Sequence, residues 1–133
     1  MDHATDALIE VEASDLNEAF AIAAKSVIET ILDSDKVEEK DERQIIVKGK
    51  DLSYLLYNWL EELIILTLTD GFAWKDIRLE LKKNSEYEIS ATLKGEEFDF
   101  KKHNFKVEIK SPTFHLMEIN QNKRTHMQFL LDL

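Results

Sequence analysis

The sequence predicts a two-layer α+β domain in which a mixed, largely antiparallel sheet packs on two helices. Two segments carry apolar residues at helical spacing, and several others alternate apolar and polar residues. Strands and helices do not alternate regularly along the chain, which favours separate layers over a doubly wound parallel fold. A length of 133 residues with one proline and three glycines indicates a single domain over residues 1–133.

The longest apolar stretch, Asp51 to Leu68, predicts the helix around which the other elements pack. Its leucines and Trp59 recur at spacings of three, four and seven residues, which places them along one stripe of a helix. Asp51 is suited to cap the first turn, and Asp70-Gly71 to close the last one in a left-handed conformation. Two glutamates inside the stretch argue against a membrane span. We therefore expect a central, buried helix.

The remaining elements follow from the same two periodicities. Before the central helix we expect a strand over residues 7–13, a helix from Leu16 to Leu32 with Asp15 and Glu18 as a capping box, and a strand around Ile45 and Val47. After it we expect a hairpin of residues 77–81 and 87–93 with its turn at Asn84-Ser85, and then strands at Lys106–Ile109, Thr113–Ile119 and His126–Leu131, the last two joined by a turn at residues 120–122.

Two segments show neither periodicity. Residues 33–43 are highly charged, so we expect a solvated loop whose carboxylates face solvent. Residues 95–104 mix charges with Phe98 and Phe100 and predict an irregular excursion. Pro112 cannot donate a backbone hydrogen bond, and we expect it at a sheet edge or a bulge.

The charge balance limits the partners that the chain can bind. With 27 acidic and 17 basic side chains, the formal net charge is -10, which repels the phosphate backbone of nucleic acids. Stable, direct nucleic-acid binding is therefore not expected. The chain has no cysteine, which excludes disulfides and thiolate chemistry, and it shows no secretory leader. We expect a monomer that resides in the cytoplasm and does not bind membranes.

The sequence contains no strong catalytic motif. Its three glycines are isolated, so no phosphate-binding loop is present. The histidines show none of the paired spacings typical of a zinc site; they are His3, His103, His115 and His126. Ser53 and Ser111 have no evident histidine partner nearby in the sequence, which leaves a hydrolase triad with little support. We predict no catalytic and no cofactor-binding residues.

Carboxylates at the two ends of the chain suggest a metal site. Asp6 lies where the first strand begins, whereas Asp132 and the terminal carboxylate of Leu133 lie where the last strand stops. If these strands are antiparallel neighbours, three anionic oxygen groups converge. Calcium accepts carboxylate oxygens with flexible geometry, so such a cluster would suit Ca²⁺. The alternative is two exposed aspartates at strand ends.

Four motifs extend over essentially the full length of the chain: His3-Ala4-Thr5-Asp6, the helical Leu55–Leu63, the segment Lys110–Met117, and the closing Asp132-Leu133. In their residues and their order they resemble the motifs of the archease family. The departures are local: Ala4-Thr5 inverts the middle pair of the family's first motif, Pro112 enters the third motif, Phe114 replaces a tyrosine, and Leu116 replaces an aspartate.

The resemblance implies a protein that activates the GTP-dependent RNA-splicing ligase of the RtcB type. That ligase joins a 3'-phosphate or 2',3'-cyclic phosphate end to a 5'-hydroxyl in tRNA splicing, and archeases promote its guanylylation and multiple turnover. The family's metal ligands correspond to Asp6, Asp132 and the Leu133 carboxylate, and its fold implies a strand-helix-strand-strand module with an insertion. Two other functions stay open: a general protein chaperone or interaction module, and a metal-dependent hydrolase of small phosphoesters.

Overall fold

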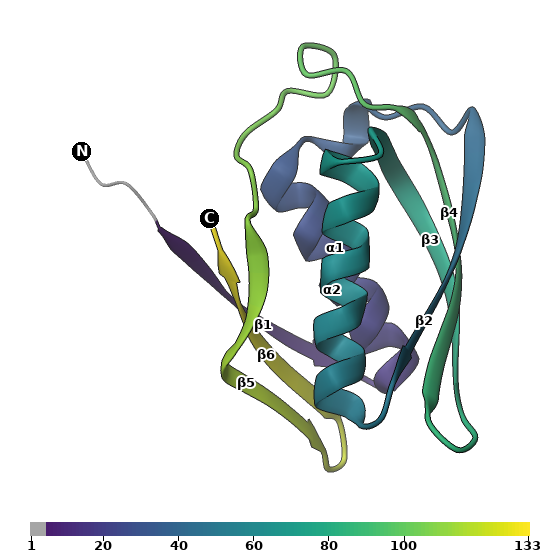
Figure 1. The fold of residues 1–133 in the computed structure, drawn as a ribbon, viewed down its shortest axis with the longest axis vertical. Coiled ribbons are helices and arrows are strands. Elements are labelled where there is room, and N and C mark those ends of the chain that lie inside the picture. The colour runs from purple at the N-terminus through teal and green to yellow at the C-terminus, as the bar shows by residue number, and fades with distance from the viewer. Residues whose placement is uncertain (1–4) are drawn as a thin grey trace.

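The computed structural model describes residues 5–133, and its two long helices lie between two three-stranded sheets (Figure 1). In chain order the elements are β1 (Asp6–Ala13), α1 (Leu16–Ile31), the short 3-10 helix η1 (Ser34–Lys36), β2 (Asp41–Gly49), α2 (Leu52–Leu68), β3 (Phe72–Lys83), β4 (Tyr87–Glu97), β5 (Ser111–Gln121) and β6 (Thr125–Asp132). Sheet A has the order β1-β6-β5, and sheet B has the order β2-β4-β3.

The α+β class is confirmed, and the strands divide between two sheets instead of forming one mixed sheet. All pairs of neighbouring strands among the described residues are antiparallel. The division arises because β2, β3 and β4 pair among themselves, whereas β1 pairs only with β6 from the other end of the chain. Helix α1 packs against β1 and β3, and α2 packs against β2 and β5, so each helix contacts both sheets.

Both helices begin where the sequence predicts. The Asp15 carboxylate accepts a hydrogen bond from the Glu18 backbone N–H at 2.9 Å, and Asp51 accepts one from the Tyr54 N–H at 2.9 Å. Each cap satisfies a backbone donor that has no partner within its helix. Gly71 follows α2 with a φ of 71°, as expected for a left-handed residue after a helix.

The core joins the helices to each other and to sheet B. Trp59 and Trp74 are fully buried. The Trp59 indole N–H of α2 donates to the Phe20 carbonyl of α1 at 3.0 Å, and the Trp74 indole N–H of β3 donates to the Thr67 hydroxyl of α2 at 3.1 Å. These bonds satisfy both indole N–H groups inside the core. They link α2 to α1 and to β3, which confirms the prediction that α2 is the central helix.

The structure corrects the prediction of a strand at Lys106–Ile109. This segment belongs to the connection between β4 and β5 and pairs with no strand. The Lys106 backbone N–H donates to the Ile31 carbonyl at 2.7 Å, the Lys110 N–H donates to the Asp132 carbonyl at 2.7 Å, and Ile109 is buried. The buried Ile109 therefore anchors a connection to the core, and the segment is not a strand of either sheet.

The charged segment from residue 33 onward is also more ordered than predicted. The prediction that its carboxylates only face solvent is wrong for two of them, which form ion pairs. Asp33 Oδ1 lies 2.9 Å from Lys106 Nζ, and Glu38 Oε1 lies 3.3 Å from Lys102 Nζ. Strand β2 begins at Asp41, well before the apolar residues that predict it, because it pairs with β4 along its full length. The β5–β6 turn falls at residues 122–124, two positions later than predicted.

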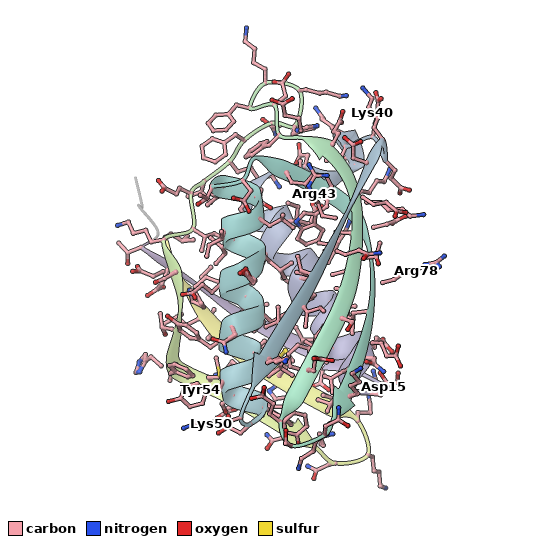
Figure 2. All side chains as sticks on the ribbon, turned by 45° about the vertical axis from the view of Figure 1, so that its right-hand side comes forward. Asp15, Lys40, Arg43, Lys50, Tyr54 and Arg78 are labelled. Atoms are coloured by element: carbon pink, nitrogen blue, oxygen red, sulfur yellow. The ribbon has the colours of Figure 1, made fainter. Side chains whose placement is uncertain are left out.

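A bulge interrupts β5, which is an edge strand as Pro112 predicts. Residues 114–117 lie opposite the single residue Phe129 of β6, and Leu116 has a φ of 61°. The Phe114 ring stacks on Tyr57 of α2 with centroids 4.5 Å apart. Tyr54 lies at 5.1 Å from Phe114, and the Lys50 ammonium lies 4.3 Å from the Tyr54 ring, at the lower end of the molecule in Figure 2. The bulge is therefore fixed onto α2.

We expect Leu116→Asn to stabilise the protein by up to about 1 kcal/mol. A left-handed backbone strains residues with a bulky side chain, and Asn and Asp tolerate it best. Urea unfolding would measure the change, with Met117→Asn as the control because Met117 has no positive φ. A stabilisation of the Met117 variant equal to that of the Leu116 variant would contradict the strain argument.

Within residues 5–133, no helix combines the length and the apolar character needed to cross a membrane.

Candidate functional site

The structure brings the two predicted metal-ligating aspartates together at the end of sheet A where β1 begins and β6 ends. Asp6 is the first residue of β1 and Asp132 the last of β6, and they are direct partners in the antiparallel register. Side chains of direct partners lie on the same face of a sheet with Cβ atoms about 4.5–5.5 Å apart. Both aspartates are exposed, so their carboxylates are open to a ligand.

The main chain around the pair is held from both sides. The Leu133 N–H donates to the Thr5 carbonyl at 3.0 Å, which continues the β1–β6 ladder by one residue. On the other side, the Lys110 N–H donates to the Asp132 carbonyl at 2.7 Å. These bonds fix residue 133 beside β1, directly after Asp132.

Ser111 is a polar neighbour that the sequence prediction missed. It is the register partner of Asp132 on β5, so Asp6, Asp132 and Ser111 form one row across the three strands of sheet A. Its hydroxyl faces the same side as the two carboxylates. The predicted strand began at Thr113, after Pro112, and therefore left Ser111 outside the sheet.

The donor set fits a hard cation in its chemistry. The two side-chain carboxylates and the Ser111 hydroxyl all offer oxygen atoms, which calcium prefers over nitrogen or sulfur. Among residues 5–133, no three or more His, Cys, Asp or Glu side chains gather as a metal-binding group. The row supplies two acidic side chains, so a cation here would take its other ligands from Leu133, Ser111 or water.

The histidines occupy separate environments, and His3 lies outside the described residues. His115 is exposed on the β5 bulge, where its backbone N–H donates to the Thr113 hydroxyl at 3.0 Å. His126 Nδ1 on β6 lies 2.6 Å from Glu12 Oε1 on β1. In the described part of the chain, neither Ser53 nor Ser111 is hydrogen-bonded to a histidine.

His103 and Glu96 form a buried polar network that sequence reasoning also missed. The fully buried His103 accepts the Asp99 backbone N–H at Nδ1 (3.0 Å), and its Nε2 lies 2.9 Å from Glu96 Oε2. Because Nδ1 is an acceptor, the ring proton belongs to Nε2 and is donated to Glu96. The Glu38 N–H donates to Glu96 Oε2 at 2.8 Å, and Lys102 Nζ donates to Oε1 at 3.0 Å.

This network determines the charge of Glu96. Burial alone would raise the pKa of Glu96, but the hydrogen bonds from Glu38, His103 and Lys102 lower that pKa to about 2. Lys40 adds a second ammonium 3.6 Å from Oε1, near the upper end of the molecule in Figure 2. Glu96 is thus an anion at neutral pH, and it joins the connection after β4 to sheet B. It lies at the end of β4 and has a structural role in fixing that connection.

Comparison with known proteins gives one consistent family. The model of the archease protein family (MTH1598/TM1083) matches residues 1–133. The protein archease of Pyrobaculum calidifontis is 36% identical over 135 residues, covering 99% of this chain and 92% of the relative. The protein archease of Pyrococcus abyssi is 36% identical over 121 residues, covering 90% of this chain and 85% of the relative.

A solved structure shows the same fold. The solution structure of protein 1598 of Methanobacterium thermoautotrophicum superposes with a TM-score of 0.79 at 31% identity, covering 100% of this chain and 96% of that chain. The resemblance read from the motifs, the full-length family match and the shared fold agree. The chain belongs to the archease family.

Proposed function

We propose that this protein is a non-enzymatic activator of the GTP-dependent, RtcB-type RNA ligase in tRNA splicing, where it promotes guanylylation of the ligase and multiple turnover. Membership of the archease family over the whole chain carries the proposal. The acidic chain also suits a partner that binds RNA and GTP through basic residues. In this role the protein works beside the ligase in the cytoplasm and contacts RNA only through it.

We infer that Asp6, Asp132 and the main-chain carboxylate of Leu133 hold a divalent cation, most fittingly Ca²⁺. The register that pairs Asp6 with Asp132 supports this inference. A bound calcium ion supplies positive charge and accepts six to eight oxygen ligands. The chain's own contribution is to align the two carboxylates on neighbouring strands and to hold residue 133 against Thr5.

Activation is tested by ligation with limiting ligase. Added at substoichiometric amounts, the wild-type protein should raise the yield above one product per ligase molecule. A product yield that stays constant across the titration would contradict the proposed function. Radioactive labelling of the purified chain by GTP would instead indicate that it carries nucleotidyl-transfer chemistry itself.

Asp132→Asn is expected to weaken calcium binding by at least about tenfold and to reduce activation, because calcium affinity follows the charge of its ligands. Asp41→Asn is the matched control, since Asp41 is an exposed aspartate at the first position of an edge strand, in sheet B. Calorimetry with CaCl₂ measures affinity, and circular dichroism checks the fold. Equal calcium affinities for the two variants would exclude Asp132 as a ligand.

An extension beyond Leu133 tests the main-chain ligand separately. It converts the carboxylate of residue 133 into a neutral amide without changing a side chain. The extended protein should bind calcium more weakly than one with an extension before Met1. If both bind calcium equally, Leu133 is not a ligand.

A general interaction module is the second candidate, and exposed apolar side chains are the observation in its favour. They are Leu8, Ile46, Tyr54, Ile65, Phe100, Phe114 and Leu116. Most are distributed over different elements, whereas a general chaperone needs one broad apolar surface. Suppression of the aggregation of an unrelated, heat-denatured protein would support this candidate over the ligase activator.

A further inference from the structure

Sheet A leaves one of its faces uncovered. Both helices pack against the face that carries the buried side chains of β1 and β6, such as Val11 and Phe129. We call the opposite side the outer face of sheet A. By strand alternation and register it is formed by Asp6, Leu8, Glu10 and Glu12 of β1, by His126, Gln128, Leu130 and Asp132 of β6, and by Ser111, Thr113, Glu118 and Asn120 of β5.

The outer face of sheet A is strongly acidic. It carries five carboxylates and one imidazole, and its outward positions include no lysine or arginine. Within the described residues, one of these carboxylates contacts a basic side chain: Glu12 Oε1 lies 2.6 Å from His126 Nδ1. The basic residues that flank β5 in the sequence are Lys110, Lys123 and Arg124. Among residues 5–133, none of them forms an ion pair with this face. Four carboxylates on this face therefore have no cationic partner from the chain itself.

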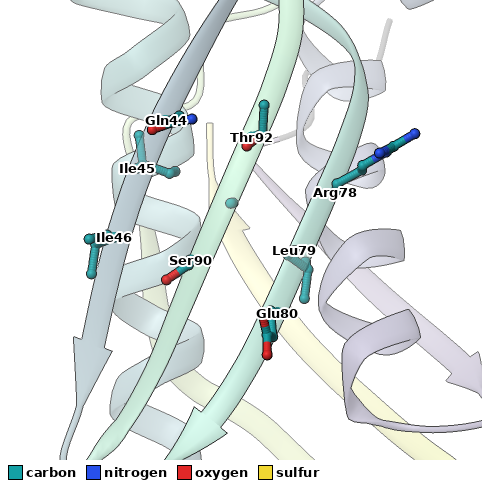
Figure 3. Close-up of a pocket in the computed structure, with 9 residues that line it drawn as sticks. Gln44, Ile45, Ile46, Arg78, Leu79, Glu80, Ser90 and Thr92 are labelled. Carbon is teal, nitrogen blue, oxygen red and sulfur yellow. The ribbon is translucent and has the colours of Figure 1, made fainter.

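The outer face of sheet B has a different charge pattern although it is equally uncovered. Its register rows carry four carboxylates and four basic side chains, so the charges on this face balance, and some of them pair across neighbouring strands. Glu88 forms ion pairs with Lys48 and Lys82 at 3.8 and 3.2 Å, and Glu42 forms one with Lys94 at 3.9 Å. Between these pairs lies an open hollow of about 640 Å³ that Arg78 and Glu80 border (Figure 3). The two sheets thus differ in electrostatics and not in openness.

Apolar side chains lie in the middle of the outer face of sheet A. Leu8 is 49% exposed and pairs in register with Leu130, which in turn faces Thr113. This apolar row lies between the row of Asp6 and Asp132 and the row of Glu10, Gln128 and Glu118. An apolar centre with polar groups around it is the usual anatomy of a protein interface.

The bulge of β5 extends this apolar surface at one edge. The Gln128 side-chain amide donates to the Leu116 carbonyl at 2.9 Å, which holds the bulge against β6. Leu116 itself is half exposed. The outer face therefore offers two leucines in its middle and a third at its rim, all on hydrogen-bonded strands.

We propose that the outer face of sheet A is the surface by which this protein docks onto a cationic protein partner. This inference rests on the proposed function, because that function makes the RNA ligase the partner that the face would bind. Glu10 and Glu118, which have no basic partner in the described chain and are not predicted cation ligands, can pair with lysines and arginines of the ligase, whereas the outer face of sheet B balances its carboxylates with an equal number of basic side chains. The same charge repels nucleic acid, an anionic membrane and a second copy of this face. Docking through it also brings the Asp6–Asp132 end of the sheet to the ligase.

Charge reversal on the two faces tests the proposal. The variant Glu10→Lys/Glu118→Lys changes exposed residues of the outer face of sheet A and leaves the predicted cation ligands intact. The matched control Asp76→Lys/Glu80→Lys changes the charge equally on the outer face of sheet B, where both residues are exposed on β3. Binding of each protein to the ligase is measured by calorimetry at several salt concentrations, and circular dichroism verifies folding.

The first variant should lose at least about tenfold in affinity for the ligase and show a weaker salt dependence, while the control stays within about twofold of the wild type. The milder Glu10→Gln/Glu118→Gln should fall between them, and it carries the test if the lysine variant does not fold. Unchanged affinity of the Glu10/Glu118 variants, or equal loss in the control, overturns the docking face. Self-association of the wild type that these variants abolish would assign the face to a second copy.

These outcomes separate the inference from the proposed function. A wild-type protein that neither binds nor activates the ligase overturns the proposed function, and the docking face falls with it. A wild-type protein that activates the ligase while the Glu10/Glu118 variants activate equally well overturns the docking face alone.

Discussion

Gly95→Ala is expected to lower the free energy of unfolding by at least about 3 kcal/mol. Gly95 lies on β4, the central strand of sheet B, opposite a bulge of β3 between Trp74 and Asp76. A Cβ at this position would lie 1.8 Å from the Ala73 carbonyl oxygen and 2.6 Å from the Trp74 Cα. Both obstacles are backbone atoms within a hydrogen-bonded sheet, so relief requires β3 and β4 to separate.

Gly71→Ala is the matched control for this prediction. Gly71 has a φ of 71°, but a Cβ there meets no atom within 4 Å, so alanine adds only the strain of a left-handed residue, about 1–2 kcal/mol. Urea unfolding followed by tryptophan fluorescence compares the two variants, since both tryptophans lie in the core. Equal destabilisation of the two would mean that close contact with β3 does not explain the glycine at position 95.

Glu96→Gln is expected to cost about 3 kcal/mol at pH 7, because it replaces a buried anion that accepts hydrogen bonds from Glu38, His103 and Lys102. The cost should depend on pH. The pKa of Glu96 lies at about 2 in the folded state, below its ordinary value of 4.5. A lowered pKa stabilises the fold above the unfolded value, and this contribution is lost as the pH falls toward the folded value.

The difference in stability between wild type and Glu96→Gln should therefore shrink between pH 4.5 and pH 2. Glu97→Gln is the control, because Glu97 is the exposed neighbour on the same strand. Thermal unfolding across this pH range measures both variants against the wild type. A difference for Glu96→Gln that stays constant down to pH 2 would show that charge is not what this side chain contributes.

The spacing of apolar residues correctly predicted the helices and strands that bury one stripe or one face along their whole length. The capped helices α1 and α2 and the β3–β4 hairpin are confirmed because each buries a continuous stripe or a single face. Periodicity could not assign strands to sheets, since pairing of β1 with β6 depends on contacts across the whole chain. It also assigned Lys106–Ile109 to a strand, because an apolar residue that anchors a connection looks the same as one that faces a sheet.

The sequence could predict the site residues that lie at the ends of strands. It could not predict the residues whose neighbours depend on the register between strands. Asp6 and Asp132 could be placed together from strand order and from the family resemblance. Ser111 could not, because its position beside Asp132 depends on where β5 begins. Glu96 and His103 are seven residues apart in a segment without periodicity, and only the folded connection reveals their contact. The calcium ion itself stays a prediction.

The pairing of β1 with β6 also sets an order of events for a chain that is still being synthesised. Strands β2, β3 and β4 and helix α2 come from the continuous segment 41–97, so sheet B can assemble as soon as that segment has left the ribosome. Strand β1 emerges first but has no partner until β6 has been made. An unpaired strand invites pairing with other chains, and charges along it oppose this. The alternating Glu10 and Glu12 can therefore protect the nascent β1 from aggregation during this delay.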